Sequence, residues 1–243
     1  MISQDQTKTA STETVFHTTA ASKIPFSVFW IYVLVFFAVW FVRALALIRV
    51  DESIQSPLWK NVFSNTVKFI IWVVPAFITL AAFRLRPLSY LKLSTPTNKR
   101  GLFVSTIVVA AWLSVVIIGE STSSGKSMGA MLSERAADWL SILIGVAISP
   151  ISEEILFRGF FLNRLNESLS FWMSNVISAL LFVAVHMPYW ISRNGFSPNV
   201  MKNLVNVFLL GCLFGWVMKK TNSLWPSIGA HVANNFLSGL IRG

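Results

Sequence analysis

Long apolar stretches separated by short polar segments dominate this sequence. A helix needs about 20 residues to cross the ~30 Å of hydrocarbon in a bilayer. On that basis we expect seven membrane spans, at about 25–48, 61–83, 102–119, 139–157, 171–191, 202–218 and 223–241. The first apolar run is longer than the ~7–15 residues of a signal-peptide core, so we expect it to be retained as a span. The pattern therefore predicts an all-α, polytopic transmembrane helix bundle.

The composition agrees with a membrane protein and excludes a soluble globule of this size. The chain is 54% apolar and only 12% charged, with a mean hydropathy of +0.64, whereas soluble domains carry about 25% charged residues. Because an indole favours the membrane interface, tryptophans near the predicted span ends support the segmentation. These are Trp30, Trp59, Trp139, Trp172, Trp190 and Trp225. The single Cys212 excludes a disulfide framework and a cysteine-based zinc site.

The net charge of +10 does not indicate a nucleic-acid partner, because the basic residues do not gather on one face. Their distribution among the loops instead indicates how the bundle is oriented in the membrane. The connection 84–100 carries five basic residues and no acid, whereas 120–138 carries both signs. The positive-inside rule then places 84–100 and the N-terminus in the cytoplasm and the C-terminus outside. Three further cations, Arg43, Lys68 and Lys202, lie near span ends, where we expect them to snorkel to the interface.

The chain divides into three predicted parts. Residues 1–23 include nine Ser or Thr and one aromatic residue, Phe16, a composition that predicts a disordered cytoplasmic tail. Residues 24–138 contain accessory spans, and residues 139–243 form a core in which apolar runs contain polar side chains. We find no inverted repeat of the kind that secondary transporters show, which argues against a transporter whose intramembrane Glu and His relay protons.

Polar side chains within hydrocarbon are costly, so they mark candidate functional positions. Among the acids and histidines, those in apolar runs are Glu153, Glu154, His186 and His231. We expect Pro150 to start a helix with Ser149 as its cap, because a first-turn residue needs no N–H donor. Glu154 and Arg158 are then four residues apart and close enough to pair. Glu153 lies about 100° around that helix and remains available to interact across the bundle.

Two further polar pairs have the same helical spacing. Phe182 and His186 share one helix face, as do His231 and Asn235. If the predicted spans are straight and have the bounds given above, Glu153 and His186 are ~10 Å or more apart along the bundle. Either the Glu153 helix continues to about Leu165 or the fifth span is shifted or broken at Pro188, and we expect the first.

Together these residues form three motifs in consecutive apolar segments: Glu-Glu-x-x-x-Arg, Phe-x-x-x-His and His-x-x-x-Asn. Their order and spacing resemble the CPBP (Abi, CAAX-protease-like) family of intramembrane proteases, over roughly residues 139–241. The resemblance implies that Glu153 activates the attacking water with help from His186. It further implies that Glu154 and Arg158 order the site and that His231 and Asn235 bind the developing oxyanion.

The same residues leave the cofactor open. Glu153, His186 and His231 form a possible His₂Glu zinc set with a fourth position for water, although the sequence has no His-Glu-x-x-His helix. A glutamate-activated water would use the same side chains without a metal, and we favour this metal-free mechanism.

The sequence therefore predicts an intramembrane endopeptidase that acts on membrane-embedded, prenylated or other hydrophobic peptides within the lipid bilayer. The rival hypothesis is a non-catalytic immunity or regulatory protein of the same fold, since the resemblance extends to bacterial proteins linked to bacteriocin self-immunity. Short charged loops and the lack of extra domains favour a multi-pass protein of a bacterial cell membrane.

Overall fold

The computed structural model describes residues 23–46, 50, 53–124 and 139–241, and regular structure in this part of the chain is entirely helical. The predicted tail lies almost wholly outside the described residues. The helices are α1 (Phe26–Ala46), α3 (Pro57–Trp72), α4 (Val74–Ala82), α5 (Pro87–Tyr90), α6 (Lys99–Ser124), α8 (Trp139–Glu154), the π-helical segment η1 (Ile155–Leu162), α9 (Asn163–Asn166), α10 (Phe171–Ala184), α11 (Met187–Asn194), α12 (Pro198–Thr221) and α13 (Trp225–Ile241).

Five of the seven predicted spans coincide with helices long and apolar enough to cross a membrane. They are Phe26–Ala46, Pro57–Ala82, Lys99–Gly119, Phe171–Asn194 and Pro198–Thr221. The other two predicted spans are also helical, as α8 with its continuation and as the 17-residue α13. The predicted all-α transmembrane bundle is therefore confirmed. Its orientation, with the N-terminus in the cytoplasm, stays a prediction.

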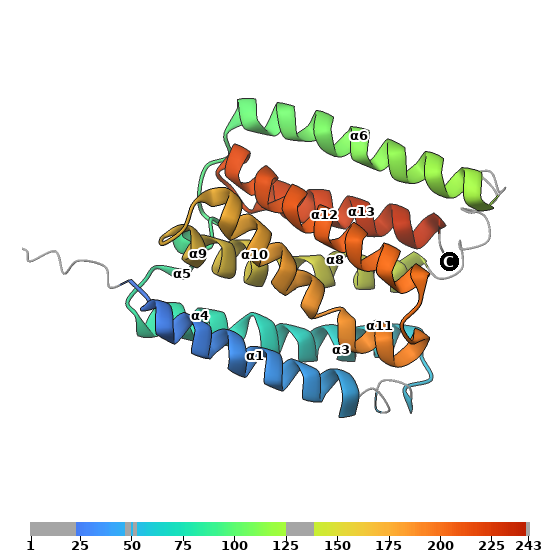
Figure 1. Cartoon of the computed structure of the whole chain (residues 1–243), viewed down its shortest axis with the longest axis horizontal. Coiled ribbons are helices and arrows are strands. Elements are labelled where there is room, and N and C mark those ends of the chain that lie inside the picture. Colours follow the sequence, from blue (N-terminus) through green and yellow to red (C-terminus); the bar gives the residue numbers. More distant parts are fainter. Residues whose placement is uncertain (1–22, 47–49, 51–52, 125–138, 242–243) are drawn as a thin grey trace, which may run out of the picture.

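The helices pack side by side in a bundle (Figure 1). One edge is α6, which contacts α12 and α13, and the opposite side is formed by α1, α3 and α4. Between them, α10 packs against α12, and α8 contacts both α3 and α13. The helices α8, α10, α12 and α13 thus form the centre of the bundle, where the sequence motifs lie.

The helix that carries both glutamates is longer than its apolar run suggested. It continues from α8 through η1 and α9, over 139–166, which confirms the expected extension past 157 and places Glu153 near its middle. Pro150 lies inside α8, so the predicted helix start at Pro150 with a Ser149 cap is wrong. All eight residues of η1 are buried, and π segments are rare features that recur at functional sites.

The fifth span is broken as well, because a turn at Val185–His186 separates α10 from α11. Pro188 occupies the first turn of α11, where its missing N–H costs no hydrogen bond. An irregular turn within hydrocarbon must have its backbone groups bonded. The indole Nε1 of Trp40 on α1 donates to the Val185 carbonyl at 3.0 Å, and the His186 N–H donates to Val183 O at 3.0 Å.

An aromatic cluster attaches α1 and α3 to the central helices. Phe36 on α1 lies edge-on to Trp72 on α3, with ring centroids 5.6 Å apart, and Trp72 lies edge-on to Phe157 of η1 at 5.5 Å. Phe29 and Phe161 extend the cluster at 5.6 Å. These contacts place one face of α3 against the helix that carries the two glutamates.

Small residues bring α10 and α12 close together. Gly211 and Gly215 are one turn apart on α12, and a Cβ added at Gly215 would overlap the Asn175 side chain on α10. Asn175 Nδ2 in turn donates to the Cys212 carbonyl at 2.9 Å. Small residues at such spacing let helix backbones approach in membranes, where hydrophobic driving force is weak.

We expect Gly215→Ala to destabilise the bundle, because the added methyl group must displace Asn175 from its hydrogen bond. Overpacking of this kind costs about 1–3 kcal/mol, and thermal unfolding of the detergent-solubilised protein measures it. Gly229→Ala is the matched control, since nothing lies within 4 Å of a Cβ at that position. Equal melting temperatures for the two variants would contradict this view of the α10–α12 contact.

Candidate active site

A cavity of about 300 Å³ lies between the central helices of the bundle. Four of the six predicted site residues line it: Glu153, His186, His231 and Asn235. The other two, Glu154 and Arg158, are 0% and 1% exposed and lie behind this wall. The structure therefore gathers all six residues in one region, from α8, η1, the α10–α11 turn and α13.

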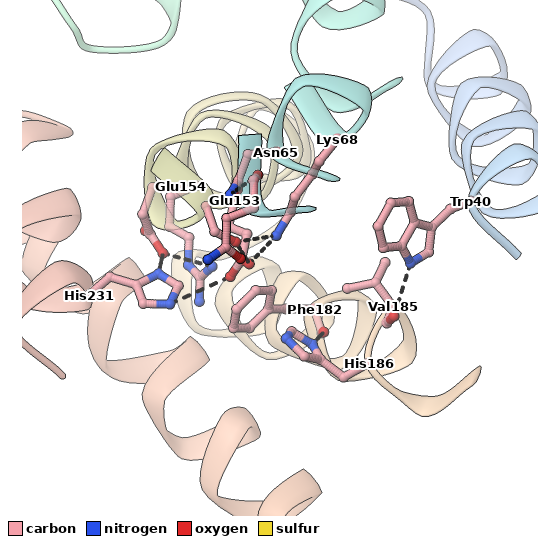
Figure 2. Close-up of polar contacts among 12 residues, drawn as sticks. Trp40, Asn65, Lys68, Glu153, Glu154, Phe182, Val185, His186 and His231 are labelled. Carbon is pink, nitrogen blue, oxygen red and sulfur yellow. Dashed lines mark hydrogen bonds and ion pairs between the residues drawn. The ribbon is translucent and has the colours of Figure 1, made fainter. Parts of the chain in front are cut away.

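Glu153 is held on both sides by side chains from other helices. Its Oε1 accepts a hydrogen bond from the Ser149 hydroxyl at 3.0 Å and forms an ion pair with Lys68 of α3. Its Oε2 faces the cavity and lies 3.5 Å from His231 Nε2. Figure 2 shows the carboxylate between Lys68 and His231.

Lys68 does not reach the membrane interface, so its predicted snorkelling is wrong. Its side chain is 13% exposed, its ammonium lies 4.4 Å from the Trp72 ring centroid, and it donates to Ser149 Oγ at 2.6 Å. A cation at this depth is more stable beside a buried carboxylate than alone. Lys68 belongs to the segment predicted to be accessory, yet it contacts the central carboxylate of the site.

Glu154 points away from the cavity and is bonded on every side. Arg158 Nη1 lies 3.1 Å from its Oε1, which confirms the pair predicted from their spacing. Ser227 Oγ donates to its Oε2 at 2.7 Å, and His231 Nδ1 donates to its Oε1 at 2.8 Å. Glu154 therefore links the 139–166 helix to α13 and orients the His231 ring.

Arg158 lies with its guanidinium against aromatic rings. Its Cζ is 4.3 Å from the Phe182 ring centroid and 5.6 Å from that of Phe214. Such contacts stabilise a desolvated guanidinium. Phe182 is thus a packing residue that lies against the guanidinium of the Glu154–Arg158 pair.

His231 contacts both glutamates, which the sequence did not predict. Its ring stacks on Phe214 at 4.7 Å and meets Phe182 edge-on at 5.9 Å. With Nδ1–H donating to Glu154, Nε2 is directed toward Glu153 and the cavity. The arrangement is that of an imidazole whose tautomer is set by a carboxylate.

His186 lies in the turn between α10 and α11 and has a defined tautomer. Its Nδ1 is 2.7 Å from the Phe182 carbonyl, and because a carbonyl only accepts, Nδ1 carries the proton. In the neutral ring Nε2 is then an acceptor. In Figure 2 the Phe182 ring lies between Glu153 and His186. Glu153 and His186 therefore share the cavity without a direct hydrogen bond between them.

Carboxamides form another part of the cavity wall, and the sequence interpretation missed three of them. Asn203 and Asn206 come from α12, and Asn234 precedes the predicted Asn235 on α13. Asn234 lies about 100° around the helix from Asn235, yet both line the cavity and Asn234 Nδ2 donates to Asn235 Oδ1 at 3.3 Å. The available signal was a pair of asparagines within the apolar run of the sixth span.

The three side chains considered as zinc ligands, Glu153, His186 and His231, are not arranged to hold one ion. Across the described ranges, no three side chains among His, Cys, Asp and Glu are placed to hold one ion. The charge of Glu153 is also compensated by Lys68. A zinc ion bound to Glu153 would have to displace that ammonium group.

Fold and site together define a multi-pass helical membrane protein with a buried polar cavity. Residues 135–237 match the family model for Type II CAAX prenyl endopeptidase Rce1-like proteins. The resemblance to CAAX-protease-like membrane proteases is thereby confirmed for this segment, which contains all six predicted site residues.

Two curated proteins are similar to part of this chain. The putative membrane peptidase YdiL of Bacillus subtilis is 28% identical over 96 residues, which are 40% of this chain and 34% of that protein. An uncharacterized 24.3 kDa protein of Escherichia coli is 30% identical over 106 residues, 43% of this chain and 44% of that protein. The chain thus matches less than half of the length of each. No solved structure is significantly similar. A membrane protease family is the coarse assignment that these matches support.

We expect Lys68→Met to destabilise the protein, because it leaves the Glu153 carboxylate buried without its counter-charge. Breaking a buried pair at one end costs of the order of 3 kcal/mol. Thermal unfolding of Lys68→Met, Glu153→Gln and the double variant gives the coupling between the two residues. Lys202→Met is the control, since Lys202 is exposed on α12. Additive effects of the two substitutions would contradict a direct ion pair.

Proposed function

We propose that this protein is an intramembrane endopeptidase in which Glu153 activates water against a peptide bond of a hydrophobic or lipidated substrate. The observation that carries the proposal is the convergence of one carboxylate, two imidazoles and four carboxamides on a single cavity inside the bundle. Hydrolysis requires acid–base groups around a space that admits both a water molecule and a peptide group.

The fixed position of Glu153 supports its assignment as the general base. Lys68 and Ser149 engage Oε1, which leaves Oε2 facing the cavity. A carboxylate held in this way keeps one oxygen directed at a bound water. The Nε2 of His186 is a second acceptor on the same cavity, so His186 assists by orienting that water.

In the proposed reaction the water oxygen attacks the carbonyl carbon while its proton moves to Glu153. The carbonyl oxygen becomes an oxyanion, and the carbon–nitrogen bond then breaks as Glu153 returns the proton to the leaving amine. His231 and Asn235 are assigned to the oxyanion. For His231 this role is supported by its bond to Glu154, because a carboxylate on Nδ1 stabilises a protonated ring that donates from Nε2.

Glu154 and Arg158 are positioning residues in this proposal. Neither lines the cavity, and both are almost completely buried. Glu154 bonds to His231 and Ser227, so it fixes the ring that faces Glu153. The two adjacent glutamates therefore have different tasks, one as base and the other as the orienting group of an imidazole.

We expect Glu153→Gln to reduce peptide hydrolysis by at least about 100-fold, because the amide keeps the shape of the side chain but cannot take the proton. The assay is mass-spectrometric detection of new peptide ends when protein reconstituted in lipid meets a pool of hydrophobic and prenylated peptides. Glu167→Gln is the matched control, since Glu167 lies outside the cavity and pairs with Arg164. New ends made equally by both variants would overturn the role of Glu153. If folded wild-type protein made none, the non-catalytic immunity or regulatory function would replace this proposal.

A chelator tests the metal-free form of the mechanism. We expect hydrolysis to survive prolonged incubation with 1,10-phenanthroline, because Lys68 already compensates the charge of Glu153 and no three potential ligands in the described ranges are placed to hold one ion. Loss of activity on chelation and its recovery on adding zinc would instead assign the reaction to a metal-activated water.

A further inference from the structure

The cavity that contains Glu153 has a polar wall to which the proposed reaction assigns no role. Asn203 and Asn206 of α12 line this wall, and Ser238 of α13 lines the same cavity. The two asparagines are three residues apart, so they share one face of their helix. That helix is long and apolar enough to cross a membrane, and polar side chains in such a helix mark candidate functional positions.

The carboxamides of Asn203 and Asn206 differ from those of other asparagines in the bundle. Asn65 and Asn175 each donate from Nδ2 to a backbone carbonyl at 2.9 Å, and so have a partner within the protein. Throughout the part of the chain that the structure describes, no residue bonds to the side chain of Asn203 or Asn206. Their donors and acceptors are therefore available to a ligand in the cavity.

The two asparagines lie toward one end of the cavity, away from His231. Phe214 of α12 stacks on the His231 ring at 4.7 Å, so it marks the level of that histidine on α12. Asn206 and Asn203 are two and three turns before Phe214, about 12 and 16 Å along the helix. Ser238 is two turns past His231 on α13, about 10 Å. Because α12 and α13 pack together and run in opposite directions (Figure 1), these polar groups lie on the same side of His231.

Apolar side chains complete the cavity around these polar groups. Phe182 and Trp190 line it from α10 and α11, and Val207 and Leu210 line it from α12. A carboxamide offers a carbonyl acceptor and N–H donors, and a peptide group offers the complementary donor and acceptor. A peptide segment with apolar side chains therefore matches both parts of the lining.

The spacing of the two asparagines suits an extended peptide. Cβ atoms three residues apart on a helix are about 5–6 Å from each other. In an extended chain the backbone groups that face one side recur at every second residue, about 6.6 Å apart. Two neighbouring carboxamides can therefore bond to one edge of the same segment. A helical segment could not use them, because its N–H and C=O groups are already bonded internally.

We propose that Asn203 and Asn206 bind the peptide backbone of the substrate, which lies extended along α12 a few residues from the bond that is cut. This inference rests on the proposed function, because it concerns how that substrate is held. Peptide groups occur in every sequence, so contacts of this kind select an unwound hydrophobic segment and not a particular side chain.

The first test measures binding without cleavage, in a Glu153→Gln background reconstituted in lipid. The probes are the hydrophobic and prenylated peptides of the cleavage assay, and native mass spectrometry measures their retention. We expect Asn203→Leu and Asn206→Leu each to weaken peptide binding about fivefold, the usual contribution of one hydrogen bond. Asn199→Leu is the matched control, because Asn199 is exposed on the same helix and lies outside the cavity lining. With Glu153 intact, the two cavity substitutions should raise KM and leave kcat nearly unchanged.

A second test changes the peptide instead of the protein. Replacing one amide of a retained peptide by an ester removes its N–H group and keeps its shape. We expect an ester at one position to weaken binding about fivefold when both asparagines are present. The same ester should have no such effect on the Asn203→Leu or Asn206→Leu variant that has lost its partner, and this non-additivity identifies a direct contact.

Thermal unfolding separates substrate binding from a structural role. We expect Asn203→Leu and Asn206→Leu to unfold at or above the temperature of their parent, because neither loses a hydrogen bond within the described chain. Weaker binding together with a lower melting temperature would assign both asparagines to helix packing and overturn the proposal.

Three further results bear on the proposal. Binding as tight as that of the Asn199→Leu control, or no retention of any peptide by folded protein, would overturn it. Cleavage by wild-type protein that neither cavity substitution affects would also overturn it and leave the proposed function in place. Peptide binding that depends on Asn203 and Asn206, without any cleavage by wild-type protein, would instead overturn the proposed function and leave these backbone contacts.

Discussion

The cost of leaving a charge unpaired in hydrocarbon governs the arrangement of the central helices. One connected network of ion pairs joins α3, the 139–166 helix and α13 through Lys68, Glu153, Glu154, Arg158 and His231. Removing a partner from such a network leaves a desolvated charge, which is far more costly than a lost surface ion pair. The network therefore fixes the relative register of three helices. It also stabilises the polar cavity, because each charge at its wall is paired with a neighbouring side chain.

An irregular stretch of backbone, and not an ion pair, positions His186. A straight fifth span would leave His186 on a helix face, whereas the turn at Val185–His186 puts it at a corner beside the cavity. The turn is stable within the membrane because Trp40 bonds its carbonyl from α1. The π-helical segment η1 is also held by a hydrogen bond from another helix. The Ser178 hydroxyl of α10 donates to the Phe157 carbonyl at 2.7 Å.

Two cavities of different character adjoin the same carboxylate. The first is lined by imidazoles, carboxamides and apolar side chains, as suits a peptide group. The lining of the second, between α1, α3, α8 and α11, includes Lys68 and three further cations. Through Lys68, the first spans contact a carboxylate of the segment that resembles known membrane proteases. A site confined to 139–241 would lack the cation that holds Glu153.

Features that depend on local periodicity could be predicted from the amino-acid sequence alone. Apolar runs predicted the spans, and four-residue spacing predicted the Glu154–Arg158 pair and the common face of His231 and Asn235, because both follow from the geometry of a single helix. The three-dimensional arrangement was needed to show that Lys68 pairs with Glu153, that His231 bridges two glutamates and that Asn203 and Asn206 line the cavity. These contacts join residues on different helices, and the relative rotation and depth of packed helices depend on the sum of all side-chain contacts between them. No pattern along one span contains that information.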